Sequence, residues 1–394
     1  MESDQFTKTN PGQAALAALA AYETAPTQEA RSALMRRYEN LRDTAWLLSG
    51  VEGKIAATAM STDGAVTLVT TDRGRATLFL RSAEGRVRQQ QLRLADNVLS
   101  PVVSRDGRRI AYLREDDGAV FWHDVTSSGE RPVGPAHPLQ GSLRDRPSGT
   151  GGGMKVSAFS PDARRLVGVS ATSRVLMWDL ETGLPRTLPN EVDVGEVWFG
   201  PDGNTLVTPG SPRSATTSMV AVDIAAGTTR ELAGDIDFVG VGVSGDGGVT
   251  VVCQKTKTDD PKTSGKANYQ AVRVADGRVL RRHAVDASCT RAVIDAKGER
   301  FAVHAEDDEW DLVDTRDDSP AQRFLGPSLF SGVDMYAGLP LLGTAREPVM
   351  ATTQHENAVI GWPMRMTGGT AFSPRSCSAT EARWWCAWAK RGTV

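Results

Sequence analysis

A short turn motif recurs six times in this chain and constrains the fold more than any other feature. In its fullest form it reads Ser-x-Asp-Gly and stands between two apolar runs. An aspartate in such a turn, with proline allowed before it, is typical of a tight connection between two antiparallel strands. Each copy therefore predicts a β-hairpin. The copies are Ser61–Gly64, Ser104–Gly107, Ser160–Ala163, Gly200–Gly203, Ser244–Gly247 and Asp295–Gly298.

The spacing of these turns predicts a repeat architecture. Their third positions fall at residues 63, 106, 162, 202, 246 and 297, so the intervals are 43, 56, 40, 44 and 51 residues. A base period of about 40 residues, with insertions, is the length of one four-stranded blade. Because one blade cannot cover its own apolar face, neighbouring copies must stack. We expect an all-β fold, a seven-bladed β-propeller of four-stranded antiparallel blades with an N-terminal α-helical segment.

A second signature ends the third strand of several copies. It is Trp178-Asp179 after the Ser160 turn, with Trp122-His123-Asp124, Val222-Asp223, Val313-Asp314 and a lone Trp362 in corresponding places. Through these endings and the turns, the chain from about residue 45 to about residue 365 resembles the WD-repeat β-propeller family. Among these strand endings only Trp178-Asp179 is a literal WD pair, and no Gly-His dipeptide opens a blade, so the family's Asp-His-Ser/Thr-Trp network is not expected.

Three segments follow from these patterns. Residues 1–42 are expected to be helical, with Asn10-Pro11 as a start and Pro26 as a break. This segment resembles the linker before the propellers of large bacterial WD-repeat signalling proteins, whose relatives carry an upstream NTPase or DNA-binding module. Residues 43–365 form the propeller and 366–394 a C-terminal tail. We expect residues 43–49 to complete the seventh blade, which closes the ring and removes exposed strand edges.

Composition narrows the partners and the compartment. The net charge of −3 favours neither nucleic acid nor a membrane surface as a partner. The alanine-rich run near the N-terminus is too short and too weakly apolar for a membrane span. The four cysteines form no CxxC pair, which favours a reducing compartment without a structural zinc. We therefore expect a cytoplasmic protein.

The motifs that usually carry chemistry are missing from the sequence. The glycine-rich stretch before Lys155 lacks the glycine of a phosphate loop and precedes a strand, so a linker is the better interpretation. The predicted inner strands are mostly small or apolar, with Glu196 as the exception. We expect no catalytic residue, cofactor or metal, and a non-enzymatic protein-interaction scaffold. The alternative is a propeller enzyme, of hydrolase or quinoprotein type, with its site at the central channel.

The longest connections are expected on one face of the ring, opposite the aspartate turns. They are the link at 126–153, the hairpins at 208–218 and 254–268, and the acidic tip at 306–309. Such elaboration on a rigid scaffold indicates binding, although unselected drift of surface loops produces the same pattern. The candidate partner-binding side chains carry both signs of charge, which suits a protein better than a polyanion. They are Arg144, Arg146, Arg213, Lys257, Lys262, Glu306, Asp307, Asp308 and Glu309.

The C-terminal tail has an unusual concentration of tryptophan. Ser378 and Glu381 form a capping box, which predicts a short helix that carries Trp384, Trp385 and Trp388. Three exposed tryptophans are unfavourable in water, so we expect the tail to dock on the propeller or on a partner. The competing interpretation is a disordered tail. Rapid release of the tail by limited proteolysis would rule out docking on the ring.

Overall fold

The computed structural model describes most of the repeat region and the N-terminal helices. The described residues are 11–41, 46–49, 55–71, 75–82, 86–94, 98–126, 131–145, 154–188, 192–194, 196–212, 217–255, 266–290, 292–295, 297–306, 309–325, 348–352 and 358–363. The chain divides into two compact units, Met1–Met364 and Arg365–Val394. The second unit, which includes Trp384, Trp385 and Trp388, lies outside the described residues.

Two helices form the N-terminal segment, as the sequence predicts. They are α2 (Pro11–Thr24) and α3 (Gln28–Leu41), and they pack against each other. Thr27 caps α3, because its Oγ1 accepts the N–H of Ala30 at 3.2 Å. Neither helix in the described part of the chain is long and apolar enough to cross a membrane.

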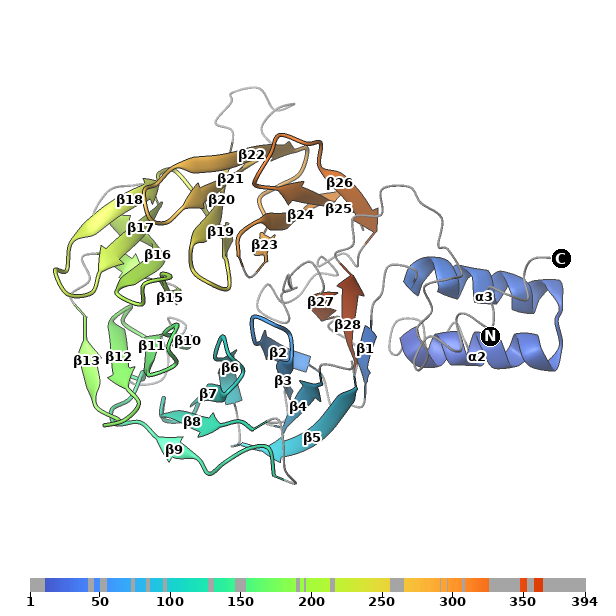
Figure 1. Ribbon diagram of the computed structural model, residues 1–394, viewed down its shortest axis with the longest axis horizontal. Helices are drawn as coiled ribbons and strands as arrows, with labels where there is room; N and C mark the ends of the chain where they lie inside the picture. The colour runs from blue at the N-terminus through green and yellow to red at the C-terminus, as the bar shows by residue number, and fades with distance from the viewer. Residues whose placement is uncertain are drawn as a thin grey trace. The chain divides into compact units, whose positions relative to one another are not determined.

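Six antiparallel sheets then follow one another along the chain (Figure 1). Sheet 1 contains β2 (Ile55–Met60), β3 (Val66–Thr71), β4 (Arg75–Arg81) and β5 (Val87–Arg93). Sheet 2 contains β6 (Val98–Val103), β7 (Arg109–Arg114), β8 (Val120–Asp124) and β9 (His137–Pro138). Sheet 3 contains β10 (Lys155–Phe159), β11 (Arg165–Val169), β12 (Val175–Asp179) and β13 (Pro185–Thr187). Consecutive strands are neighbours in each, so every sheet is a meander.

The next three sheets repeat this order. Sheet 4 contains β14 (Val192–Val194), β15 (Trp198–Phe199), β16 (Thr205–Pro212), β17 (Ser218–Asp223) and β18 (Thr229–Ala233). Sheet 5 contains β19 (Asp237–Val243), β20 (Val249–Lys255), β21 (Ala267–Arg273) and β22 (Val279–Val285). Sheet 6 contains β23 (Val293–Ile294), β24 (Arg300–Glu306), β25 (Glu309–Asp314) and β26 (Gln322–Leu325). Sheet 4 has a fifth strand because its first strand is interrupted, and both pieces pair with β16.

A three-stranded sheet joins segments from the two ends of the repeat region. It contains β27 (Pro348–Thr352), β28 (Ala358–Pro363) and β1 (Trp46–Ser49), in the order β1-β28-β27. Strand β1 runs antiparallel to β28, with Trp46 opposite Gly361 and Ser49 opposite Ala358. The predicted pairing of residues 43–49 with the last strands of the repeat region is therefore confirmed.

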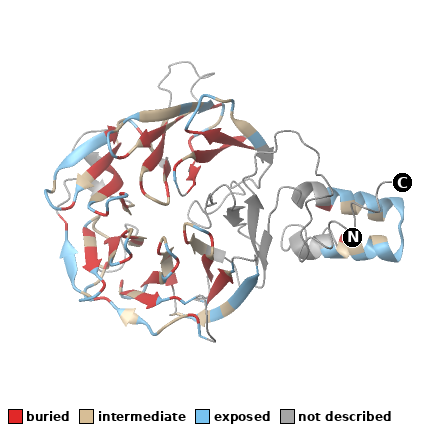
Figure 2. Ribbon diagram, viewed as in Figure 1, coloured by how far each residue is buried: buried red, intermediate tan, exposed pale blue. Residues whose placement is uncertain are grey.

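Neighbouring sheets are held together by shared apolar cores. Leu68 and Leu78 of sheet 1 pack with Ile110 of sheet 2, and all three side chains are fully buried. Similar clusters join each pair of successive sheets up to sheets 5 and 6. The fourth strands are largely exposed while the second and third are buried (Figure 2). Each sheet thus covers the apolar face of the next, as stacking of repeats requires.

The recurring turns share one set of hydrogen bonds. Ser61 Oγ donates to Asp63 Oδ1 at 2.6 Å and accepts the Val66 N–H at 3.0 Å, while Asp63 Oδ1 accepts the Ala65 N–H. The turns that begin at Ser104, Ser160 and Ser244 repeat this arrangement. The predicted hairpins are therefore confirmed. We call the side of the sheets that carries these turns the turn face.

Arginine side chains connect the turns to one another on this face. Arg109 Nη1 donates to the carbonyl oxygen of Ala163 at 2.5 Å, which links sheet 2 to sheet 3. Arg165 Nη2 donates to the Gly203 carbonyl at 2.7 Å, which links sheet 3 to sheet 4. Arg105 Nη2 reaches the carbonyl of Phe199 at 3.0 Å and so joins sheet 2 directly to sheet 4. Hydrogen bonds from arginines therefore connect the turn-face loops of sheets 2, 3 and 4.

A disulfide connects sheet 5 to the segment that leads into sheet 6. Cys253 on β20 is bonded to Cys289, and both residues are buried in the core that these two sheets share. The expectation of reduced cysteines is therefore wrong for this pair. A separation of 36 residues in the sequence gives no sign that the two cysteines are neighbours in the fold. Disulfides persist in oxidising environments, so the pair counts against the reducing compartment that the cysteine pattern favoured.

Removal of this disulfide is expected to destabilise the protein measurably. Closing a loop of this length stabilises a fold by about 3–4 kcal/mol in the chain-entropy description. The Cys253→Ala/Cys289→Ala variant should therefore unfold at a lower denaturant concentration than the wild type, and dithiothreitol should shift only the wild type. Equal midpoints for the wild type with and without dithiothreitol would show that the bond contributes nothing.

Buried His123 makes the stability of sheet 2 dependent on pH. Its Nδ1 lies 2.9 Å from the Gly134 carbonyl, whereas its Nε2 is buried without a partner in the described structure. Burial lowers the pKa of His123 below the ordinary 6.5. Below pH 6.5 His123 is protonated in the unfolded chain more readily than in the folded chain. The contribution of neutral His123 to the free energy of unfolding is therefore complete above pH 6.5 and falls as the pH drops below it.

Unfolding measured between about pH 7 and pH 5 tests this expectation. The wild type should lose free energy of unfolding over this range, and His123→Phe, which keeps a flat ring against Tyr112, should lose less. Identical pH profiles for the two proteins would contradict the assignment.

Candidate functional site

The side opposite the turn face carries the longer connections of the repeat. The first strand of each sheet ends at the turn face, so its N-terminal end, the turns between second and third strands and the links between sheets lie on the other side. We call this side the insertion face. It is the side on which the sequence places the candidate partner-binding residues.

The link between sheets 2 and 3 is fixed across this face in its described part. Ser142 Oγ donates to the carbonyl of Asp117 at 2.6 Å, and the Leu143 N–H donates to the Gly118 carbonyl at 2.9 Å. The Leu143 carbonyl in turn accepts the N–H of Ala171 at 3.0 Å. Leu143 itself is fully buried between the two sheets. The link therefore bridges the β7–β8 turn and the β11–β12 turn.

Asp145 is the polar anchor of this link. Its carboxylate accepts hydrogen bonds from Ser170 Oγ at 2.6 Å, from the Thr172 N–H at 3.1 Å and from the Thr172 hydroxyl. Burial opposes ionisation, but the hydrogen bonds from Ser170 and Thr172 outweigh it and lower the pKa of Asp145. Arg144 is placed next to this anchor, because its N–H donates to Ser142 Oγ at 2.9 Å. The sequence analysis missed Asp145, since its partners lie 25 and 27 residues away.

An ion pair joins the inner strands of sheets 3 and 4 on the same side. Lys155 begins β10, and its Nζ contacts Oε1 of Glu196, which lies two residues before β15. Both side chains are at least partly buried, at 31% and 16% exposure. Thr208 Oγ1 donates to the Glu196 carbonyl at 2.7 Å and fixes the backbone there. Glu196, the exceptional carboxylate of the predicted inner strands, thus has a basic partner one repeat earlier.

A chain of charged groups lies across sheets 5 and 6. Glu309 Oε2 accepts from Arg323 Nη1 at 2.9 Å, and Arg323 Nε donates to Asp311 Oδ1 at 2.9 Å. The second oxygen of Asp311 lies 3.0 Å from His283 Nε2 on β22. Asp311 is buried, so these contacts compensate a charge held between two sheets.

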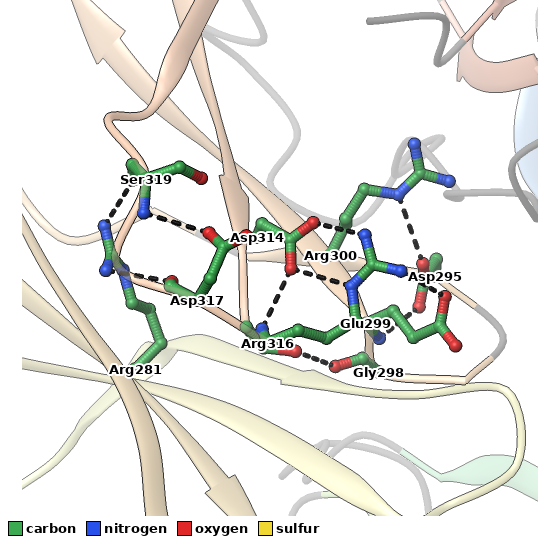
Figure 3. A network of polar contacts seen from close by, with 10 residues as sticks. Arg281, Asp295, Gly298, Glu299, Arg300, Asp314, Arg316, Asp317 and Ser319 are labelled. Carbon is green, nitrogen blue, oxygen red and sulfur yellow. Dashed lines mark hydrogen bonds and ion pairs between the residues drawn. The ribbon is translucent and has the colours of Figure 1, made fainter.

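The turn face of sheet 6 holds a second charged network (Figure 3). Asp295, where four other turns have serine, faces Arg300 across 3.6 Å, and both side chains are buried. Burial raises the pKa of Asp295 above the ordinary carboxyl value. Arg316 bridges Asp314 and Glu299 nearby. The acidic groups of this turn region therefore have basic partners.

Arg281 connects the same network to sheet 5 (Figure 3). From β22, its guanidinium donates to the carbonyl oxygens of Asp317 at 3.0 Å and Ser319 at 2.7 Å. Arg230 on β18 reaches the Val274 and Ala275 carbonyls of sheet 5 in the same way. At the junctions of sheets 4 and 5 and of sheets 5 and 6, an arginine on the fourth strand of one sheet thus binds carbonyl groups in the turn between the third and fourth strands of the next sheet.

The predicted partner-binding residues have different outcomes. Arg144 lies half-buried beside the Asp145 anchor, and Glu309 pairs with Arg323. Glu306 ends β24, but its side chain is not among the described ones. No described contact joins Arg144 to Glu309, so these two do not form one local cluster. Outside the described residues lie Arg146, Arg213, Lys257, Lys262, Asp307 and Asp308.

The described residues contain no group of three or more His, Cys, Asp or Glu side chains arranged to hold a metal ion. No protein-family model matches the chain, and no curated protein matches it in sequence.

Proposed function

We propose that the sheets form a closed seven-bladed propeller of the WD-repeat type. The order β27-β28-β1 corresponds to the second, third and fourth strands of the other sheets. Trp362 pairs with Val349 across β27 and β28 as Trp178 pairs with Leu166 across β11 and β12. The recurring tryptophan position thus supports a seventh blade whose fourth strand is β1. A ring closed by hydrogen bonds presents no unpaired edge between its first and last blades.

We propose that this propeller is a protein-interaction scaffold and that its insertion face binds the partner. The observation that carries the proposal is the fixed link on this face, where Asp145 and Leu143 hold Arg144 against two turns. Because this connection is already fixed, little conformational entropy of its backbone is lost when a partner binds. The mixed charges predicted for this face favour a protein with complementary charges of both signs.

Affinity capture with three baits tests this function. The baits are the wild type, the insertion-face variant Arg144→Glu/Arg146→Glu/Lys262→Glu, and a turn-face variant with the same charge change at three exposed residues, Arg186→Glu/Arg278→Glu/Lys297→Glu. A partner that the wild type and the turn-face variant retain, and that the insertion-face variant releases, is the expected result. Release from the turn-face variant alone would place that interaction on the wrong face for this proposal.

A further inference from the structure

We propose that the turn face over sheets 2 and 3 is a second binding surface, which receives an acidic segment of a protein partner. The surface, here called the basic turn patch, contains Arg105, Arg108 and Arg164. It is separate from the insertion face, and its argument does not depend on the scaffold function proposed above.

The arginines of this patch have guanidinium groups available to a ligand. Arg164 is exposed, and its nearest acidic neighbour is Asp162 of the same turn. Arg108 is 83% exposed in its side chain and has only a 4.0 Å contact with Asp106. Arg105 uses Nη2 for the Phe199 carbonyl, while its Nε and Nη1 have no hydrogen-bond partner among the described residues. Burial lowers the pKa of Arg105, and the neighbouring carboxylate of Asp246 opposes this effect.

The neighbouring aspartates are held mainly by hydrogen bonds within their own turns, although Asp106 Oδ2 also lies 4.0 Å from Arg108 Nε. Asp106 Oδ1 accepts the hydroxyl of Ser104 and the backbone N–H of Arg108. Asp162 Oδ1 accepts in the same way from Ser160 and from the backbone N–H of Arg164. One oxygen of each carboxylate is therefore occupied by the turn itself.

The two turns carry an excess of positive charge on a chain whose net charge is −3. The turns at 104–109 and 160–165 carry five arginines and two aspartates, a balance of +3, which Asp124 and Asp179 at the ends of the third strands reduce to +1. A positive region on a negative protein steers an acidic segment toward this surface.

The arginines lie on adjacent turns. The hydrogen bond from Arg109 Nη1 to the Ala163 carbonyl, at 2.5 Å, joins the residue after Arg108 to the residue before Arg164. Arg108 and Arg164 also occupy the same position of the repeat, four residues after the serine. At that position sheet 6 has Glu299, which is paired with Arg316 (Figure 3). Among the six sheets, an arginine at this position is therefore particular to sheets 2 and 3.

The spacing of charges favours carboxylates on a peptide over a nucleic acid. A guanidinium binds a carboxylate through two parallel hydrogen bonds, which makes separate arginines good receptors for separate acidic side chains. A nucleic acid instead needs a continuous basic surface that releases many counterions. Here aspartates stand between the arginines, so a discrete acidic segment is the better fit.

Fluorescence anisotropy with a labelled oligoglutamate peptide tests the proposal on the full chain. Arg108→Glu/Arg164→Glu should raise the Kd for this peptide at least about tenfold, because two attractive charges become repulsive. Arg105 is left unchanged, since it also ties sheet 2 to sheet 4. The matched control is Arg186→Glu/Arg278→Glu, which alters two exposed arginines of sheets 3 and 5 and the same net charge. Thermal melts of both variants establish that the fold is intact.

The outcomes separate this surface from its alternatives. Little change in the control, and in the insertion-face triple variant, supports a local site on the turn face. If Arg186→Glu/Arg278→Glu raises the Kd for the peptide as much as Arg108→Glu/Arg164→Glu does, the effect is one of net charge and the proposal is overturned. Stronger competition by duplex DNA than by oligoglutamate at equal charge would overturn the choice of an acidic protein segment.

Discussion

Removing residues 1–49 is expected to lower the melting temperature of the protein by about 10 °C. The deletion takes away β1, which pairs with β28 over four residues from Trp46 to Ser49. It leaves β28 as an open edge without the backbone hydrogen bonds and cross-strand pairs to β1, a loss on the order of 5 kcal/mol. For a protein of this size each kcal/mol corresponds to about 2 °C. A thermal melt followed by circular dichroism measures the shift.

A shorter deletion separates the strand from the helices. Removing residues 1–41 takes away α2 and α3 but keeps β1, and it should change the melting temperature by only about 2 °C, because helices in this range pack on each other. If both deletions melt together, the strand contributes nothing and the closure of the ring by β1 is wrong.

The Gly247→Ala substitution is expected to cost about 3–5 kcal/mol or to prevent folding. Gly247 has a φ of +70°, where a side chain is strained. A Cβ there would also lie 2.0 Å from the carbonyl oxygen of Phe199, which is backbone and has little freedom to move. The turn of sheet 5 is seated directly on sheet 4 at this point, so the substitution separates two blades. Chemical denaturation measures the loss.

Two substitutions at comparable turn positions serve as controls. Gly183 has the same φ of +70°, but a Cβ there would meet only the Pro138 carbonyl at 3.9 Å, so Gly183→Ala should cost about 1 kcal/mol of strain alone. Ala163 already occupies the corresponding turn of sheet 3 with a φ of +56°. Ala163→Gly relieves that strain but loses a buried methyl group, and the net change should stay within about 1 kcal/mol. Equal costs for Gly247→Ala and Gly183→Ala would refute the proposed contact between sheets.

The amino-acid sequence by itself determined the local structure of this protein. A turn such as Ser61–Gly64 is closed by hydrogen bonds among residues at most five positions apart, so its sequence is sufficient to predict it. The repeat of that turn then predicted the sheets and their order, because each four-stranded meander is built from consecutive strands. The pairing of the strand at 43–49 was predictable because this strand precedes the first repeat and the last repeat lacks a fourth strand.

Only the tertiary structure decided which distant side chains meet. Arg105 reaches Phe199 across 94 residues, Cys253 bonds to Cys289 across 36, and Asp145 holds Thr172 across 27. Each of these contacts depends on how one sheet is rotated and seated against another, and apolar packing sets that geometry without leaving a motif in the sequence. The order of strands in each repeat predicted which face carries the long connections. That Asp106 and Asp162 each use one carboxylate oxygen within their own turn, beside the exposed Arg108 and Arg164, became visible only in the tertiary structure.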